Sequence, residues 1–417
     1  GDFYPPADHY PNTTDGFDFG CRPMNETTGA VIGQLLWTSF DLYQHVLWVP
    51  KDQAADVEER VIPIIERAVN VYLRMGEANG WVPGQTPLHT PYAFSPEYAM
   101  CTDCNFDVAL VRWALGVLMH RQSKQQHRYK QAFYDLVAAP TDPNEGWLIG
   151  ADTHLTQGHR HYSHLFPFFP LRLVKWNQSA PNSSANSLIE KSVDHWWHLA
   201  LVGPGEGVTG FSYVAVGLMS MWMGRLEAGV GNVSQLLFAS LHSDANGGIH
   251  TPTTMYYEKW ANTPEGRSMC LETPLTVAHF YQEACLQSWE GVLRVFPGMV
   301  SSWANSSFHE LRAQGGVLVT ASRVEGVTQF IQLRPLGFVP NVLVDASSMP
   351  LPWTADLSTV TLSMTSVDSV EVVKITGLKA NQTLVLITTG SSPELIVRPN
   401  PTSPAESNFW GYGPPRN

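Results

Sequence analysis

The spacing of apolar residues changes at about residue 294. Between about residues 28 and 293 they recur every three or four positions, the period of a helix with one buried face. Residues 52–75 show this clearly, although Pro63 should kink the helix or mark a new start. Residues 107–120 and 212–226 are apolar nearly all round, as buried inner helices would be. Further helices are predicted at 28–48, 124–138, 185–202, 232–241 and 274–293, which suggests about nine helices in all. The predicted apolar face of 52–75 comprises Val61, Ile64, Ile65, Ala68 and Tyr72.

The C-terminal third has the pattern of a β domain. Short β-branched runs separated by turns predict strands at 317–320, 328–333, 360–364, 370–375 and 383–388. Together they indicate an antiparallel domain, a small sandwich. The predicted organisation is a helical domain over 1–293, a β-sandwich-like domain over 294–400 and an extended tail over 401–417. Strands and helices do not alternate along the chain, which argues against a parallel α/β fold.

Composition narrows the class of protein. The chain has 417 residues, of which 44% are hydrophobic and only 15% charged, so it has ample material for a folded core. Its formal net charge of −12 excludes a general electrostatic attraction to nucleic acid or anionic lipid. No run approaches the roughly 18 apolar residues that a membrane-spanning helix needs. We therefore expect neither a nucleic-acid partner nor a membrane span.

Glycosylation sequons and cysteines indicate the secretory pathway. Asn-x-Ser/Thr sequons are more frequent than average composition predicts, and such sites are used only along that pathway. We expect a protein that is secreted or delivered to a lysosome or vacuole. The five cysteines include one Cys-x-x-Cys pair but no second pair with zinc spacing, so they predict a disulfide without fixing its partners. The sequons lie at Asn12, Asn25, Asn177, Asn182, Asn232, Asn305 and Asn381.

A histidine-rich segment is the densest candidate binding site. His159, Arg160, His161 and His164 lie beside Tyr162 and the apolar run that follows. Fixed hydrogen-bond donors next to flat apolar faces are what a sugar ring requires. One alternative is a metal site, although the spacing matches neither the i, i+4 helical pattern nor a familiar zinc motif. The other is a set of histidines with a purely structural role. No metal or other cofactor is implied.

Two carboxyl groups are candidates for acid and base catalysis. Glycoside hydrolysis uses one carboxyl group that holds a proton and another that activates water or attacks. Glu97 follows a proline among aromatic residues, where desolvation would raise its pKa and suit it to act as an acid. Glu272 also lies next to a proline, at the start of a predicted helix. Both could instead be first-turn carboxylates that stabilise a helix N-terminus. Other acids, Asp107 and Glu283 among them, are interpreted as ordinary helix or loop residues.

Several short motifs follow one another along residues 15–320. They are Ser-Pro-Glu at 95–97, His-Arg-His-Tyr-Ser-His-Leu at 159–165, Thr-Gly-Phe-Ser at 209–212 with Trp222 and Arg225, Glu-Ala-Cys-Leu-Gln-Ser at 283–288, Val-Phe-Pro-Gly at 295–298, and Leu-Arg-Ala-Gln-Gly-Gly at 311–316. In this order they resemble segments of glycoside hydrolase family 95, the inverting α-L-fucosidases and α-L-galactosidases. The motif at 159–165 is the most specific.

The resemblance implies a fold and an activity. The fold would be mainly α, an (α/α)6 toroid that is incomplete at its N-terminus here, followed by a small antiparallel β domain. Glu97 would be the general acid, Glu272 would occupy the place of the Asp that helps polarise the attacking water, and 159–164 would line the sugar pocket. The expected activity is hydrolysis of a terminal α-linked sugar, α-L-fucose or α-L-galactose, with inversion.

The sequence also departs from the family pattern. Glu replaces Asp at 272, and Thr-Pro-Leu-Thr-Val at 273–277 replaces an expected Gly-Asn-Phe-Gly-Gly. The family's Asn-x-Asn segment would lie upstream of residue 1. We therefore expect residues 1–417 to be a C-terminal fragment of a precursor whose N-terminal part remains bound as a second chain. The alternative function is a catalytically silent glycan-binding or structural glycoprotein.

Overall fold

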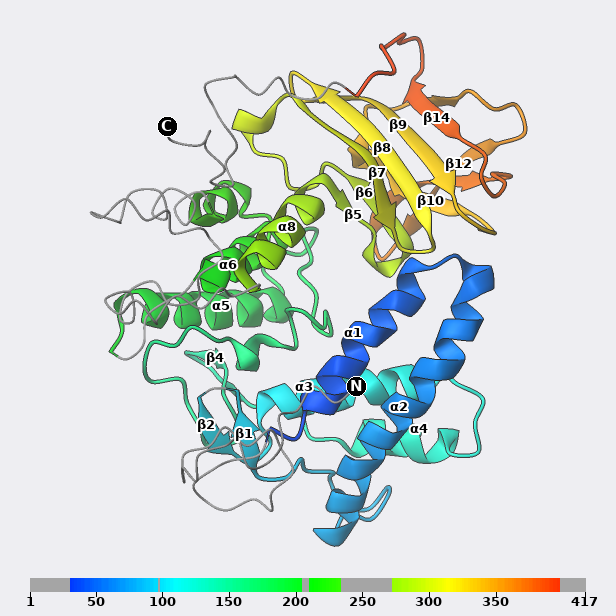
Figure 1. Cartoon of the computed structure of the whole chain (residues 1–417). Coiled ribbons are helices and arrows are strands. Elements are labelled where there is room, and N and C mark those ends of the chain that lie inside the picture. The colour runs from blue at the N-terminus through cyan, green and yellow to red at the C-terminus, as the bar shows by residue number, and fades with distance from the viewer. Residues whose placement is uncertain (1–30, 97, 205–209, 234–271, 398–417) are drawn as a thin grey trace, which may run out of the picture. The chain divides into compact units, whose positions relative to one another are not determined.

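The computed structural model describes residues 31–96, 98–204, 210–233 and 272–397 (Figure 1). The chain forms two compact units, each made of separate stretches of sequence. The first unit contains the described residues up to Thr38 together with Ile65–Leu155 and His161–Leu173. The second contains Ser39–Ile64, Thr156–Arg160 and the described residues from Val174 onward.

The first unit is built around helix α3, Asn105–Leu118, which is buried on nearly every side. Its Phe106 ring makes T-shaped contacts with Trp37 and Phe166, at centroid distances of 5.7 and 4.9 Å. Such edge-to-face pairs add to the free energy gained by burying the rings. The unit also contains α4, Gln126–Asp135, and two short hairpins. These pair β1, Ala93–Ser95, with β2, Ala99–Cys101, and β3, Thr141–Asp142, with β4, Gly146–Trp147.

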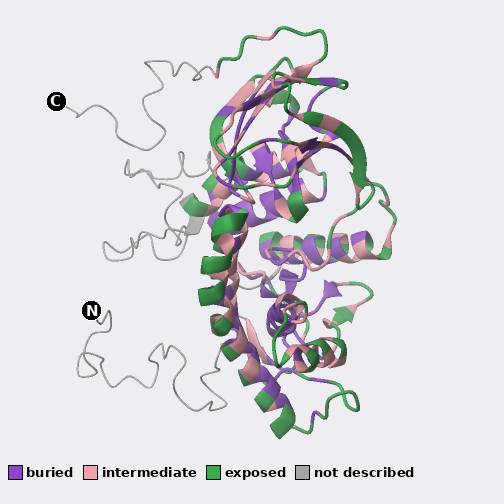
Figure 2. Ribbon diagram, turned by 90° about the vertical axis from the view of Figure 1, so that its right-hand side faces the viewer, coloured by how far each residue is buried: buried purple, intermediate pink, exposed green. Residues whose placement is uncertain are grey.

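The longest helix is α2, Lys51–Ala78, and it continues through Pro63. Its buried residues recur with helical spacing and confirm the predicted apolar face, except that Ile64 is half-buried. The opposite side of the helix carries the exposed residues, coloured green along the helix in Figure 2. The buried positions are Val61, Ile65, Ala68, Val69, Tyr72, Leu73 and Gly76.

The helices of the second unit pack closely against one another. It contains most of α1, Gln34–Trp48, with α5, Ser184–Val202, α6, Gly210–Trp222, a helical segment at 226–233, and α8, Glu272–Cys285. A Cβ atom on Gly217 of α6 would lie 2.8 Å from Val233 Cγ2 and 3.3 Å from Phe280 Cε2. Glycine at 217 therefore lets α6 approach both neighbouring helices.

Two five-stranded sheets form the rest of the second unit. In one, the strand order is β12-β13-β10-β6-β5, and β6 runs parallel to β10. The order in the other is β11-β14-β9-β8-β7, with antiparallel pairs throughout. The strands of the first sheet are β5 (Leu286–Gln287), β6 (Val292–Val295), β10 (Val342–Asp345), β12 (Thr361–Val367) and β13 (Val370–Thr376). Those of the second are β7 (Ser306–Ala313), β8 (Val317–Val324), β9 (Val327–Pro335), β11 (Trp353–Ala355) and β14 (Leu384–Thr388).

Length and β-branched content explain which strands the sequence predicted. All five predicted strands are confirmed, as β8, β9, β12, β13 and β14. The other five strands of the sheets were not predicted, because β5, β6, β10 and β11 are only two to four residues long. Strand β7 reads Ser-Ser-Phe-His-Glu-Leu-Arg-Ala, with a register shift between Phe308 and Leu311 that breaks the alternation.

The predicted (α/α)6 toroid is wrong. The described residues contain eight helices, with 41% helix and 23% strand in four small sheets. A toroid of this kind needs about a dozen helices in two rings, and its helical content would be higher. One physical reason for the error is the predicted helix at 274–293, which ends at Cys285 and gives way to β5 and β6. Helices α3 and α6 are apolar on nearly every side, and they are buried as predicted. A helix can be buried in this way without belonging to the inner ring of a toroid.

The other structural predictions have mixed outcomes. The helix predicted at 232–241 lies mostly outside the described residues, and so does the tail from 401 onward. The domain limits 1–293, 294–400 and 401–417 stay predictions. In the part of the chain that the structure describes, no helix is both long and apolar enough to cross a bilayer.

Candidate functional site

The two predicted catalytic carboxyl groups are not available for a geometric test. Glu97 lies outside the described residues. Glu272 is the first residue of α8, but its side chain also lies outside the described part. The described geometry is that of the motifs that surround them in sequence.

Two of the motifs meet in the first unit. The Ser95 hydroxyl, at the end of β1, hydrogen-bonds the Ser163 hydroxyl across 2.8 Å. Both serines are buried, and 68 positions separate them in sequence. A buried hydroxyl that lost its partner would retain the full cost of desolvation, so the pair fixes the end of β1 against the helix η2, Ser163–Leu165. The contact joins the Ser-Pro-Glu motif to the histidine-rich motif.

The histidine-rich segment is more buried than a wall of sugar-binding donors would be. His159 and His164 expose 7% and 1% of their surface, whereas Arg160 and His161 are half-buried. The predicted binding residues also divide between the units, since His159 and Arg160 belong to the second and His161 and His164 to the first. This burial favours a role for His159 and His164 in holding the segment.

Main-chain contacts anchor the start of this segment in the second unit. Trp196 Nε1 of α5 donates a hydrogen bond to the His159 carbonyl oxygen at 3.0 Å. Ser212 Oγ of α6 donates to the Arg160 carbonyl oxygen at 2.8 Å, which joins the Thr-Gly-Phe-Ser motif to the histidine-rich one. A Cβ on Gly158 would lie 2.5 Å from the Leu199 carbonyl oxygen, so only glycine allows this approach to α5.

The remaining motifs also contact one another within the second unit. Trp222 Nε1 of α6 donates to the Glu283 carboxylate of α8 at 3.2 Å. The motif at 283–288 then meets the next one, because Phe296 N donates to the Cys285 carbonyl oxygen at 2.7 Å. Finally, Gln314 N donates to Ser288 Oγ at 3.0 Å, which joins the motif at 311–316. Segments that are far apart in sequence thus form a connected set.

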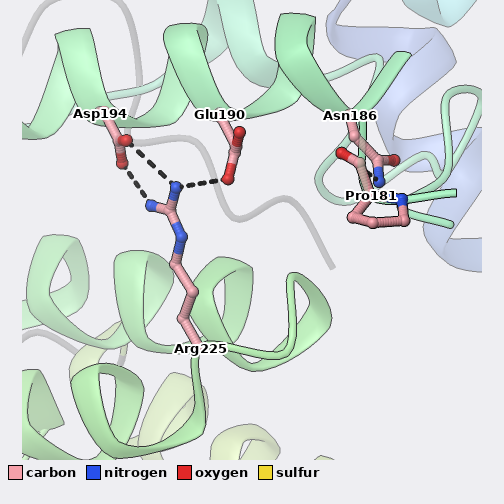
Figure 3. A network of polar contacts seen from close by, with 5 residues as sticks. All are labelled: Pro181, Asn186, Glu190, Asp194 and Arg225. Carbon is pink, nitrogen blue, oxygen red and sulfur yellow. Dashed lines mark hydrogen bonds and ion pairs between the residues drawn. The ribbon is translucent and has the colours of Figure 1, made fainter. Parts of the chain in front are cut away.

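Arg225, the last residue of the Trp222 motif, binds two acids of α5 (Figure 3). Its Nη1 lies 2.6 Å from Asp194 Oδ1 and its Nη2 lies 2.9 Å from Glu190 Oε1. The hydrogen bond to Asp194, more than the one to Glu190, raises the pKa of Arg225. Because Asp194 and Glu190 are partly exposed, water screens these contacts. These contacts position the turn after α6. Both carboxylates are paired with Arg225 and are therefore interpreted as structural groups.

The sequence interpretation missed a buried acid in α3. Asp107, interpreted as a helix-start residue, is fully buried and accepts a hydrogen bond from the Tyr72 hydroxyl on its Oδ1. Its Oδ2 is also buried and has no hydrogen-bond partner among the described residues. Desolvation raises the pKa of Asp107 to about 7, although hydrogen bonds from Tyr72 and the Gly33 backbone oppose the rise. An acid within an otherwise apolar helix was the available signal.

The described residues contain one disulfide, one free cysteine and five of the seven sequon asparagines. Cys101 and Cys104 form the predicted disulfide between β2 and the start of α3. Cys285 is a free thiol, and burial raises its pKa to about 11, so it is unreactive at neutral pH. The described side chains include no group of three or more His, Cys, Asp or Glu that could hold a metal ion. Of the sequon asparagines, Asn177, Asn182, Asn305 and Asn381 are exposed, Asn232 is half-buried, and Asn12 and Asn25 lie outside the described residues.

Comparison with known proteins adds no independent assignment. No family model matches the chain, and no curated protein matches it. The resemblance to glycoside hydrolase family 95 thus rests on the motifs alone.

Proposed function

We propose that this protein is a glycosidase of the secretory pathway that removes a terminal α-linked sugar, in the first place α-L-fucose, with inversion. The observation that carries the proposal is the set of hydrogen bonds that connects the motifs. Ser95 meets Ser163 in the first unit, and the later motifs meet one another in the second. The motifs were selected by their resemblance to one enzyme family, and several of them that are far apart in sequence meet within a unit.

In the proposed reaction Glu97 protonates the glycosidic oxygen as the bond to the anomeric carbon breaks. Glu272 accepts a proton from a water molecule that attacks the opposite face of the sugar. Room for that water predicts that the two carboxyl groups are about 6.5–9.5 Å apart. Ser95 and Ser163 would act as positioning residues, because their hydrogen bond holds the strand that leads to Glu97.

The exposure of four sequon asparagines supports passage through the secretory pathway. Asn177, Asn182, Asn305 and Asn381 are accessible to solvent, as acceptors of an N-linked sugar must be. The protein would be secreted or delivered to a lysosome or vacuole.

The proposal is tested by hydrolysis of a small panel of natural and aryl glycosides, led by α-L-fucosides and α-L-galactosides. Proton NMR would follow which anomer is released first by the protein purified with all its associated chains. Initial release of the β-anomer from an α-L-glycoside supports an inverting glycosidase and identifies the sugar. Initial release of the α-anomer contradicts inversion.

A second candidate is a glycan-binding protein without activity. One observation favours it, the replacement of the family Asp by Glu272. A single added methylene displaces the carboxylate, which can be enough to misplace the water. Saturable sugar binding without turnover across the panel would support this candidate over the enzyme.

A further inference from the structure

A cavity in the second unit lies beside one of the sequons. It has a volume of about 980 Å³, at the upper end of the range for small-molecule sites. It is bordered by α8, by the start of β7 and by β8, and Asn305 itself contributes to its lining. Ala284 and Cys285 of the motif at 283–288 also line it, but the proposed reaction gives neither residue a role.

The lining combines aromatic rings with hydrogen-bonding groups. Tyr281 and Trp303 lie with ring centroids 5.7 Å apart and planes inclined by 35°. His309, Arg323 and Gln329 add polar groups. The Nε of Arg323 is buried and has no hydrogen-bond partner among the described residues. A sugar can stack its C–H face on such rings while its hydroxyl and amide groups bond the polar side chains.

The backbone holds Asn305 in a defined orientation. Glu325 N donates to Asn305 Oδ1 at 2.8 Å, and Gly326 N donates to the Ala304 carbonyl oxygen at 2.9 Å. Both donors belong to the turn between β8 and β9. The contact engages the amide oxygen, whereas an N-linked sugar is attached to the amide nitrogen, Nδ2. Glycosylation and the Glu325 contact are therefore compatible.

We propose that Asn305 carries an N-linked glycan whose first N-acetylglucosamine residues fold back into this cavity and stack on Trp303 and Tyr281. Attachment transfers an oligosaccharide from a lipid-linked diphosphate donor. The bond between the sugar C1 and the diphosphate oxygen breaks, C1 bonds Nδ2, Nδ2 loses one proton, and the lipid diphosphate leaves. A tethered sugar has a high effective concentration at a cavity that its own attachment residue lines, which favours this occupant over a free ligand. The proposal rests on the secretory route that forms part of the proposed function.

The test uses the full chain made in a secretory host that adds N-linked glycans. Ser307→Ala removes the sequon but keeps Asn305 and its contact with Glu325, and Ser307→Thr is the matched control that keeps the sequon. Thr383→Ala removes the sequon at Asn381, which is not among the described residues that line the cavity. Mass spectrometry of glycopeptides would measure occupancy, and thermal unfolding would measure the contribution of each glycan.

We expect a glycan on Asn305 and a fall in the unfolding midpoint of about 2–4 °C for Ser307→Ala, with little change for Ser307→Thr or Thr383→Ala. Trp303→Ala should lower the midpoint in the glycosylated protein but lower it less in the Ser307→Ala background, because the two changes remove the same contact. Additive effects would overturn the proposal.

Other outcomes separate this proposal from the proposed function. A bare Asn305 in a protein that is glycosylated at Asn177 overturns only the cavity proposal. If that bare protein bound free chitobiose in a Trp303-dependent manner, the cavity would be a site for external sugars, and the proposal would also fail. Hydrolysis of α-L-fucosides by Ser307→Ala, measured in parallel, reports on the proposed function alone.

Discussion

The first unit buries ionisable side chains, whereas the strands of the two β-sheets keep theirs at least partly exposed. Asp107 of α3 is fully buried, and desolvation raises its pKa to about 7. Glu310 of β7 is exposed, and a hydrogen bond from Arg334 of β9, two strands away in the sheet, lowers its pKa. Among the described strands of the two sheets, no ionisable side chain is buried. The same carboxyl chemistry is thus shifted in opposite directions by burial in one region and by a charged neighbour in the other.

This difference indicates that the two regions are stabilised in different ways. Apart from β12, which has no buried residue, the strands of the two sheets bury apolar side chains, so ordinary burial can stabilise them. The first unit contains polar pairs that cost free energy unless both partners are present, such as Ser95 with Ser163 and Asp107 with Tyr72. Such pairs are typical of regions that hold functional groups in place.

The largest expected effect concerns the independence of the two units. Phe106→Ala in α3 and Phe330→Ala in β9 each remove a fully buried ring and should each cost about 3–5 kcal/mol. If the units open separately, Phe106→Ala accelerates amide hydrogen exchange by about 100- to 1000-fold in the first unit only. Phe330→Ala does so in the second unit only. Equal acceleration in both units by either variant would show that they unfold as one.

Asp107 predicts a pH dependence of the first unit. Its folded pKa of about 7 lies above the ordinary value of 3.8, so the folded state binds the proton more tightly. The stability that this group contributes is complete below about pH 4 and is lost as pH rises through 7. A shift of about three units corresponds to about 4 kcal/mol between these limits.

Asp107→Asn should remove this dependence, because an amide group does not titrate in this range. Its oxygen can still accept the hydrogen bond from the Tyr72 hydroxyl. Urea unfolding at pH 4, 5.5 and 7 would compare it with Glu371→Gln, a control that removes an exposed carboxyl group of β13. Parallel pH profiles for the wild type and Asp107→Asn would contradict this account of the buried acid.

The Ser95–Ser163 pair predicts a smaller effect. Ser95→Ala or Ser163→Ala alone leaves a buried hydroxyl without its partner and should cost about 1–3 kcal/mol. The double variant should cost less than the sum, because it leaves neither hydroxyl unpaired. Denaturant unfolding of the four proteins measures this coupling. Strict additivity would mean that the two motifs are not linked through these hydroxyls.

The sequence predicted the elements better than the architecture. Strands such as 328–333 and 370–375 were predictable because alternation reports burial on one face. The helix at 52–75 was predictable for the same reason, since Val61, Ile65 and Tyr72 share a face. The toroid was not predictable from these patterns, because an apolar helix indicates that it is buried and does not indicate which elements bury it.

The candidate site was predictable only as a set of motifs. The resemblance implied roles for Glu97 and for the segment 159–164, but it did not indicate the hydrogen bonds that Ser95 and Ser212 make to this segment. The burial of His164 could not be predicted either, because its environment comes from elements distant in sequence. Asp107 was overlooked because a carboxylate in the first turn of a helix is usually exposed and favourable there.

The central claim, that Glu97 is the general acid, is tested most directly by the leaving-group dependence of Glu97→Gln. The control is Glu77→Gln, an exposed residue of α2 whose carboxylate pairs with Arg128. On a natural α-L-fucoside we expect kcat to fall by about 10²- to 10⁴-fold in Glu97→Gln, because the departing oxygen needs a proton. On an aryl fucoside with an acidic leaving group the fall should be much smaller, while Glu77→Gln should match the wild type on both substrates. Equal activity of Glu97→Gln and Glu77→Gln on the natural fucoside would contradict the account.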